Sequence, residues 1–135
     1  VKKRNKNILN TINSLKKGNC FITSGPLLKI SFLSNNYRYN MGSTIIANKG
    51  LLQICAKSSS EFGIIKKIVI KKGIICNKVE MEQFTIQNIN TYDLNIEFEE
   101  YTITKCYFRC EGEFANSNGD KIVAFTNPIW LYPKK

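Results

Sequence analysis

The side chains of this sequence that could act as nucleophiles have no obvious base to activate them. Nucleophilic catalysis by a serine or a cysteine needs a base within hydrogen-bond reach, and histidine is the usual one. The sequence contains no histidine, so Ser24, Cys20 and Cys106 would depend on a lysine or a carboxylate. Ser24 lies beside Gly25, but in neither a GxSxG nor an SxxK pattern. The sequence therefore predicts no catalytic nucleophile.

The carboxylates offer a second kind of chemistry, paired acid and base catalysis. Glu97, Glu99 and Glu100 are close in the sequence. Glu97 and Glu99 share one face of a predicted strand, and we expect that face to be the solvated one. No Walker A or GxGxxG pattern is present to cradle a phosphate. We therefore expect no catalytic, cofactor-binding or metal-binding residue in this chain.

The cysteines are odd in number, and no two of them have CxxC spacing: Cys20, Cys55, Cys76, Cys106 and Cys110. On one strand, Cys106 and Cys110 would lie about 13 Å apart, which is too far for a disulfide. Without histidine, a zinc site would need cysteines or carboxylates alone. Reduced, mostly buried thiols predict a cytoplasmic protein.

The formal charge of the chain is +10. Such an excess can mark a protein that binds nucleic acid or another anionic surface. The chain is also crowded with Lys, Ile and Asn together, which is typical of an A/T-biased genome and makes lysine the default surface residue. We therefore do not expect nucleic acid to be a partner.

Two further patterns leave a binding function open. Residues 62–79 carry only bases and residues 80–100 only acids, which indicates either cross-strand pairing on a solvated face or an anion-binding patch. The bases are Lys66, Lys67, Lys71, Lys72 and Lys78, and the acids are Glu80, Glu82, Asp93, Glu97, Glu99 and Glu100. Some aromatic residues could stack on sugars, although such residues more often cap a core: Tyr37, Tyr39, Tyr107, Trp130 and Tyr132. The alternative function is thus a binding module for an anionic polymer or a carbohydrate, using residues 66–78 and exposed tyrosines.

One amphipathic helix is predicted over residues 5–17. Its apolar residues recur at i, i+1, i+4 and i+7, which makes one stripe: Ile8, Leu9, Ile12 and Leu15. Lys16 and Lys17 suit the last turn, and Gly18 is a candidate C-cap. The stripe must bury either against the sheet of this domain or against a preceding domain.

The rest of the chain is typical of about eight or nine short strands bounded by turn residues. Strand-like segments cover residues 20–23, 27–34, 43–47, 51–58, 63–72, 74–81, 84–89, 92–101, 102–114 and 121–131, the last interrupted at Pro128. Alternation places three sets of residues each on one face of its strand: Leu28, Ile30 and Phe32; Leu52, Ile54 and Ala56; and Cys106, Phe108 and Cys110. This spacing predicts an all-β fold, an antiparallel immunoglobulin-like β-sandwich with one N-terminal helix. We expect a linker helix over residues 1–18 and a sandwich domain over residues 19–135.

The sequence predicts neither a signal peptide nor a membrane segment. No apolar run approaches the ~20 residues that span a bilayer, and the basic start has no apolar stretch behind it. The membrane is therefore not an expected partner. Because the chain starts at Val1 without an initiator methionine, we expect it to be a piece of a longer protein.

Several motifs, in order along nearly the whole chain, carry a resemblance to a known family. They are a helix ending in Lys17-Gly18-Asn19, then Thr23-Ser24-Gly25-Pro26, Met41-Gly42-Ser43-Thr44-Ile45, a hairpin over residues 68–77, Tyr107-Phe108-Arg109-Cys110-Glu111-Gly112, and Ala124-Phe125-Thr126-Asn127-Pro128-Ile129-Trp130. The chain resembles the C-terminal domain that follows the catalytic barrel in PHP (polymerase and histidinol phosphatase) superfamily phosphoesterases of the CehA/McbA type. Ser43 departs from the family's usual Asp, and Tyr107 from a frequent Trp.

The resemblance implies a non-catalytic accessory domain. In that family the divalent metals sit in the N-terminal barrel on His, Asp and Glu, so the resemblance implies no catalytic or metal-binding residue here. It implies that the main partner is the protein's own PHP barrel, a metal-dependent hydrolase, whose active-site entrance this domain would border. From the residues themselves, Gly25 and Gly42 are expected at turns. Thr126 and Asn127 are expected to hydrogen-bond backbone that Pro128 leaves unpaired.

Overall fold

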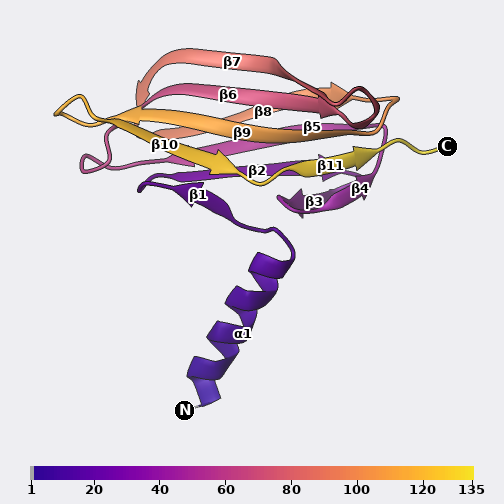
Figure 1. Ribbon diagram of the computed structural model, residues 1–135, viewed down its shortest axis with the longest axis horizontal. Coiled ribbons are helices and arrows are strands. Elements are labelled where there is room, and N and C mark those ends of the chain that lie inside the picture. Colours follow the sequence, from indigo (N-terminus) through magenta and orange to yellow (C-terminus); the bar gives the residue numbers. More distant parts are fainter. Residues whose placement is uncertain (1) are drawn as a thin grey trace.

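A computed structural model describes the backbone of residues 2–135 and the side chains of residues 7–135. Within that part of the chain one helix, α1 (Lys2–Lys16), precedes eleven strands. The strands form two facing sheets, which confirms the predicted all-β sandwich (Figure 1). Their bounds are β1 (Phe21–Thr23), β2 (Leu27–Ser34), β3 (Tyr37–Asn40), β4 (Thr44–Ile46), β5 (Lys49–Lys57), β6 (Ile64–Ile74), β7 (Val79–Thr91), β8 (Asp93–Tyr101), β9 (Cys106–Ala115), β10 (Lys121–Thr126) and β11 (Ile129–Tyr132).

Strand β9 organises the seven-stranded sheet. One edge of β9 pairs with β6, which pairs in turn with β7. The other edge pairs with β10 along one half and with β11 along the other, and these two strands carry β1 and β4. Pro128 lies in the break between β10 and β11, where it need not donate to a ladder. The predicted interruption at Pro128 is therefore confirmed.

The four-stranded sheet has the order β3-β2-β5-β8, and all its pairs are antiparallel. Its inward residues alternate with outward ones as predicted: Leu28, Ile30 and Phe32 on β2 and Leu52, Ile54 and Ala56 on β5 are buried. They meet the inward residues of the other sheet, among them Ile68, Ile70 and Phe108, in one core. Burying a side chain of this size stabilises a fold by about 1.5–3 kcal/mol.

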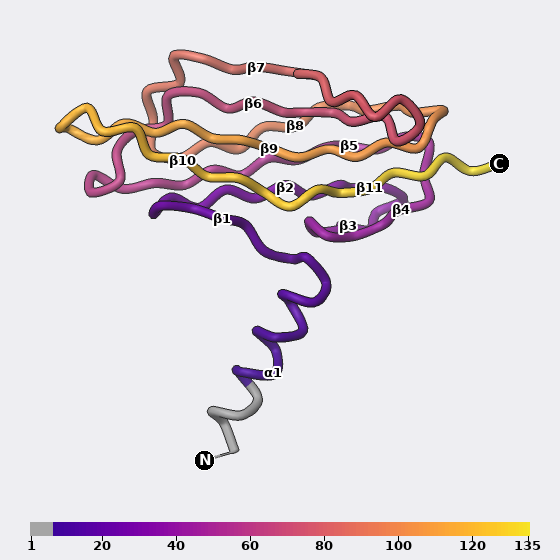
Figure 2. The backbone as a smooth tube through the Cα atoms, viewed as in Figure 1, coloured from indigo at the N-terminus to yellow at the C-terminus, as the bar shows by residue number. Residues whose placement is uncertain are grey.

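The end of helix α1 follows a Schellman motif. Gly18 has φ +68°, and its N–H donates to Leu15 O at 3.0 Å, while the Asn19 N–H donates to Ser14 O at 2.9 Å. The predicted glycine cap is thus confirmed. The helix then points away from the sandwich instead of lying on a sheet (Figures 1 and 2). No helix in the described residues is long and apolar enough to cross a bilayer.

Four expectations about the strands were wrong in detail. Strand β3 was not predicted; it follows a tight turn at Asn35 and Asn36, both with positive φ. The hairpin expected over residues 68–77 turns later than predicted, because β6 runs to Ile74 and a 3₁₀ turn follows at Ile75–Asn77; residues 79–91, where parts of two strands were expected, form the single strand β7. The strand expected over residues 102–114 starts only at Cys106. The sheet is also not wholly antiparallel, because β11 pairs with β4 in parallel.

Candidate functional site

The motifs at the two ends of the sandwich meet where helix α1 joins it. The Asn127 side chain donates from Nδ2 to Gly18 O at 3.1 Å and to Cys20 Sγ at 3.1 Å. The Gly42 N–H donates to Pro128 O at 2.8 Å. Gly42 has φ +84°, and a Cβ there would overlap the Lys17 carbonyl oxygen. These residues form a built junction that fixes where the helix leaves the sandwich.

The Thr23-Ser24-Gly25-Pro26 motif is held by its own hydroxyl groups. Thr23 Oγ1 donates to Pro26 O at 2.6 Å and accepts from Gly25 N at 3.0 Å. The Ser24 hydroxyl donates to Val123 O and accepts from Val123 N, both at 3.2 Å. Both oxygens serve the backbone, so the candidate nucleophile Ser24 ties β1 to β10.

Thr126 completes the broken edge of β9. Its Oγ1 accepts the Cys110 N–H at 2.9 Å, at the point where β10 has ended and β11 has not begun. Thr126 therefore bonds the backbone beside the break, but the group it satisfies is an N–H donor, whereas the missing N–H of Pro128 leaves an acceptor unpaired. Asn127 bonds the helix end instead. A hydroxyl thereby satisfies a buried N–H that would otherwise cost about 1–3 kcal/mol.

The candidate thiols and carboxylates do not form a catalytic group. Cys106 and Cys110 point into the core, and burial raises the pKa of both thiols. Glu97 and Glu99 share the outward face of β8, as predicted, whereas Glu100 points inward and is buried. In the described part of the chain, no cluster of three or more Cys, Asp or Glu side chains could hold a metal ion.

The basic stretch 66–78 is divided between the two faces of β6. Lys71 pairs outward with Glu111 at 3.5 Å, and Lys72 pairs inward with Glu100 at 3.4 Å. Lys66 donates to the side chain of Asn90. Both lysine ion pairs involve acids from other strands, so most of this stretch is engaged within the fold.

The candidate sugar-stacking rings also lie apart. Tyr107 and Trp130 pack with centroids 5.0 Å apart on the outer face of the seven-stranded sheet. Tyr37 and Tyr39 pack at 4.7 Å on β3 of the other sheet, and Tyr39 contacts the core. Tyr132 lies beneath the ammonium group of Lys105. The five rings therefore do not make one stacking platform.

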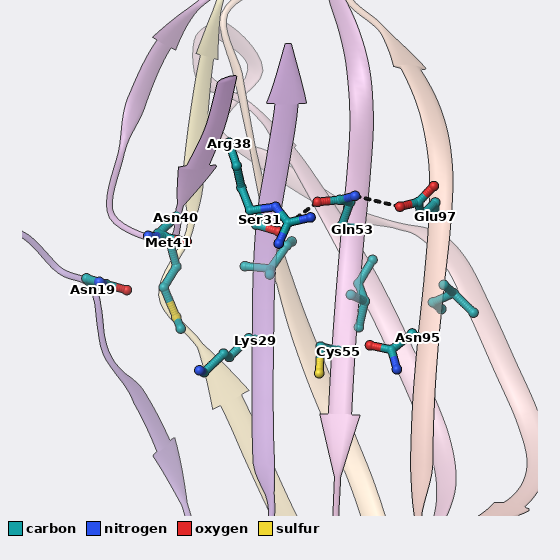
Figure 3. Close-up of a pocket in the computed structure, with 13 residues that line it drawn as sticks. Asn19, Lys29, Ser31, Arg38, Asn40, Met41, Gln53, Cys55, Asn95 and Glu97 are labelled. Atoms are coloured by element: carbon teal, nitrogen blue, oxygen red, sulfur yellow. Dashed lines mark hydrogen bonds between the residues drawn. The ribbon is translucent and has the colours of Figure 1, made fainter. Parts of the chain in front are cut away.

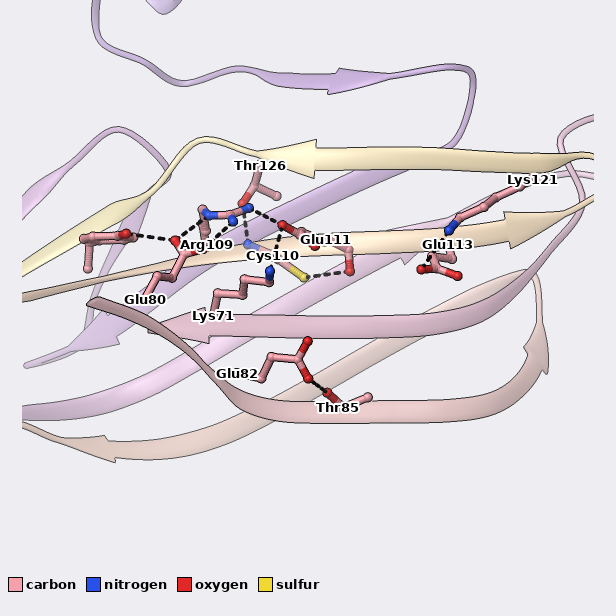
Figure 4. A network of polar contacts seen from close by, with 11 residues as sticks. Lys71, Glu80, Glu82, Thr85, Arg109, Cys110, Glu111, Glu113, Lys121 and Thr126 are labelled. Carbon is pink, nitrogen blue, oxygen red and sulfur yellow. Dashed lines mark hydrogen bonds and ion pairs between the residues drawn. The ribbon is translucent and has the colours of Figure 1, made fainter. Parts of the chain in front are cut away.

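Arg109 centres a polar network on the outer face of the seven-stranded sheet (Figure 4). Its Nε donates to Glu80 Oε2 at 2.7 Å, a second nitrogen bonds Glu80 Oε1, and a third bonds Glu111. Tyr107 donates to Glu80 Oε2 at 2.8 Å. The Arg109 bonds lower the pKa of Glu80, and the bond to Glu80 raises the pKa of Tyr107. Lys71 also pairs with Glu111, so each carboxylate of the network has a cation beside it. The pair of Glu80 and Arg109 joins β7 to β9.

The outer face of the four-stranded sheet instead has an open polar hollow of about 430 Å³ (Figure 3). Side by side in the ladder, Ser31 donates to Gln53 Oε1 at 3.3 Å and Gln53 donates to Glu97. Arg38 comes from β3 and lies over β2 beside Ser31 (Figure 3). The other polar lining residues are Asn19, Lys29, Asn40, Cys55 and Asn95.

The polar lining of the hollow makes it a candidate ligand site. Its volume falls in the range of about 300–1,000 Å³ that is usual for small-molecule sites, but so do the volumes of two larger depressions, about 590 and 650 Å³, so volume alone does not single it out. It offers a guanidinium, an ammonium, amides, a hydroxyl and a carboxylate, which suit binding rather than bond cleavage. A groove beside it, lined by Lys16, Lys17 and residues of β3, shares Arg38 and Asn40 with it.

Of the residues that line the hollow, sequence reasoning considered only Glu97 and Cys55 for chemistry, and neither as part of a binding site. Arg38, Lys29 and Gln53 come from three different strands, and β3 itself was not predicted. One signal was present: arginine is rare in this lysine-rich chain, at Arg4, Arg38 and Arg109 only. Because Glu80 and Glu111 bond Arg109, Arg38 is the arginine of the sandwich that is left to consider as a ligand contact.

Comparison with known proteins gives no relative for this chain. No family model matches it, and neither the curated proteins nor the solved structures include a significant match.

Proposed function

We propose that this chain is the non-catalytic accessory domain of a PHP-type metal-dependent phosphoesterase, and that it packs on the catalytic barrel through α1. The observation that carries the proposal is the apolar stripe of α1. Its four side chains remain 42–60% exposed: Ile8, Leu9, Ile12 and Leu15. The stripe does not bury against this domain's own sheets, which leaves a preceding domain as the expected contact.

The free energy available from the stripe is appreciable. Full burial of one Leu or Ile side chain is worth about 1.5–3 kcal/mol. With roughly half of each side chain still exposed, covering all four would contribute about 3–6 kcal/mol. For two domains of one chain, much of the entropy cost of association is already met by the linkage. This surface is sufficient to hold a tethered domain in place.

The junction supports the same proposal. The motifs that carry the family resemblance, at residues 17–19, 41–45 and 124–130, meet where α1 leaves the sandwich, and Asn127 and Gly42 bond or contact that point. Residues that fix the exit angle of a docking helix would also fix how the sandwich sits beside the barrel. The domain would then border the active-site entrance.

The divalent metals of such an enzyme would belong to the barrel. The described residues of this chain contain no cluster able to hold a metal ion, and Glu80 and Glu111 are occupied by Arg109. The contribution of this domain would be positioning and shape. Its cysteines are free thiols and would suit a reducing compartment, which supports a cytoplasmic location as part of the proposal.

The first test is an activity assay of the 135-residue chain with Mn²⁺, Mg²⁺ or Zn²⁺ and p-nitrophenyl phosphate or its bis-ester. The proposal expects no hydrolysis above the metal-only background. Turnover that rises in proportion to the protein concentration would overturn it.

The second test is to determine the coding sequence upstream of Val1. The proposal expects a PHP barrel with its His and Asp motifs, and a different domain there would contradict it. In the two-domain protein, Ile12→Asp places a charge in the stripe, and Asn10→Asp places the same charge on the opposite side of α1. Limited proteolysis should cleave near α1 faster in the first variant only. Equal cleavage of both variants would refute docking through the stripe.

A further inference from the structure

The polar hollow on the four-stranded sheet has an unbalanced charge. Among the described side chains, neither Lys29 nor Arg38 forms an ion pair. The single carboxylate in the hollow, Glu97, takes a hydrogen bond from the Gln53 amide. The hollow is therefore lined by two cations and one anion, and the anion is bonded to a neutral donor.

The groove beside the hollow adds to this excess. It is lined by Lys16, Lys17 and Arg38 and has no acidic residue. Because Asn19, Arg38, Asn40 and Met41 line both depressions, hollow and groove form one continuous surface. Glu97 is the one acid among the described lining residues of this surface, so its excess of positive charge should concentrate anionic ligands.

The two arginines of the sandwich make the contrast plain. Arg109 is held by Glu80 and Glu111, whereas Arg38 is exposed and forms no ion pair with any described side chain. A guanidinium fork binds phosphate or carboxylate through two parallel hydrogen bonds. The Arg38 fork is available for such an anion.

The neutral lining residues suit hydroxyl groups. Asn40 lies next to Ser31 across the β2–β3 ladder, and Asn95 lies next to Cys55 across the β5–β8 ladder. The Asn95 Nδ2 group is bound to Asp93, which leaves its carbonyl oxygen as an acceptor. Amides both donate and accept, so an array of them beside a fixed anion contact can orient a sugar.

We infer that the hollow binds a small, hydroxyl-rich organic anion, with Arg38 holding its anionic group, Lys29 adding positive charge at the rim, and the Asn and Gln side chains holding its hydroxyls. A sugar phosphate and a sugar acid share this chemistry. The site is separate from the apolar stripe of α1, so it does not depend on the proposed docking to a barrel.

The experiment is isothermal titration calorimetry of the 135-residue chain at low ionic strength, where charge contacts are least screened. The ligands are glucose 6-phosphate, glucuronate, glucose and inorganic phosphate. We expect one-to-one binding of at least one anionic sugar, tighter than inorganic phosphate, and no binding of glucose. Binding of glucose 6-phosphate alone assigns the anion as phosphate, and binding of glucuronate alone assigns it as carboxylate.

The matched variants are Arg38→Gln and Lys66→Gln, which each remove one positive charge from an exposed side chain. A hydrogen bond to a charged group is worth about 1.5–3 kcal/mol, so Arg38→Gln should weaken binding roughly tenfold or more. Lys66 lies on the other sheet, and its variant should bind within about twofold of the wild type. No binding of either anionic sugar, or an equal loss in both variants, would overturn the proposal. Thermal melts of both variants verify that they are folded.

Discussion

Lys72 and Glu100 form an ion pair between the two sheets, and its removal should destabilise the sandwich strongly. Lys72 points inward from β6 and Glu100 inward from β8, with 3.4 Å between Nζ and Oε2. Their side chains are only 14% and 5% exposed. The Lys72 ammonium also lies 5.0 Å from the centroid of the Phe108 ring. Replacing Lys72 by Met keeps most of the apolar stem of the side chain and leaves Glu100 buried without its cation.

The expected loss can be worked out from the geometry. At 3.4 Å and an effective dielectric of about 20, the attraction is about 5 kcal/mol before desolvation is counted. Breaking a buried pair from one side usually costs about 3–5 kcal/mol. Gln83 still donates to Glu100 at 3.4 Å, which reduces the loss to about 2–3 kcal/mol. For a domain of this size that corresponds to roughly 10 °C in Tm.

The measurement is urea unfolding of three variants beside the wild type. Lys72→Met should lose about 2–3 kcal/mol of unfolding free energy, and the double variant Lys72→Met with Glu100→Met should recover to within about 1 kcal/mol of the wild type. The matched control is Lys57→Met, which breaks the exposed pair with Asp93 and should cost less than about 1 kcal/mol. If Lys72→Met and Lys57→Met cost the same, the reasoning from burial is refuted.

Three other predictions concern the network, the thiols and the junction. The folded-state pKa of Glu80 is lowered, so the stabilisation from its ionised form is present above the unfolded pKa and is lost as pH falls through the folded pKa. Glu80→Gln should therefore reduce the loss of stability below about pH 4, as measured by urea midpoints across pH. If stability falls with acid as steeply in the variant as in the wild type, this prediction is wrong. Cys76 is exposed, whereas Cys106 and Cys110 are buried and their thiol pKa values are raised. Ellman's reagent should therefore modify Cys76 in the native protein and leave the two core thiols unmodified until the protein unfolds. Modification of those two thiols in the native state would disprove their burial. Gly42→Ala should lower stability by about 1–3 kcal/mol because its φ is positive and its Cβ would overlap the helix end, and a thermal melt with an unchanged Tm would count against the junction.

Local periodicity in the sequence was sufficient to predict the buried strand faces and the end of the helix. Alternation along β2, β5 and β9 placed the buried faces correctly, since one face of each strand must enter the core. The Schellman end of α1 was predictable from Gly18, because a glycine tolerates the left-handed conformation that this cap requires. These features are set by residues close together in the sequence, so they could be predicted without knowing which distant residues are in contact.

The features missed depend on contacts across the sandwich. Glu100 breaks the outward pattern of Glu97 and Glu99, and only the position of Lys72 on the facing sheet explains a buried carboxylate there. Strand β3 has four residues, too few for a clear period. The residues of the polar hollow come together only through the ladder of β3, β2, β5 and β8, so their neighbourhood could not be deduced from spacing.

The two outer faces of the sandwich differ in how their charges are used. On the seven-stranded sheet, Arg109 and Lys71 are matched by Glu80 and Glu111, so these four charges are not available to a ligand. On the four-stranded sheet, Arg38 is not matched in this way, and the junction residues place the cationic end of α1 beside it. A helix held at that angle would carry the stripe to one partner while leaving the hollow open to another. The two proposals are therefore compatible: Ile12→Asp should impair docking and spare ligand binding, and Arg38→Gln should do the reverse.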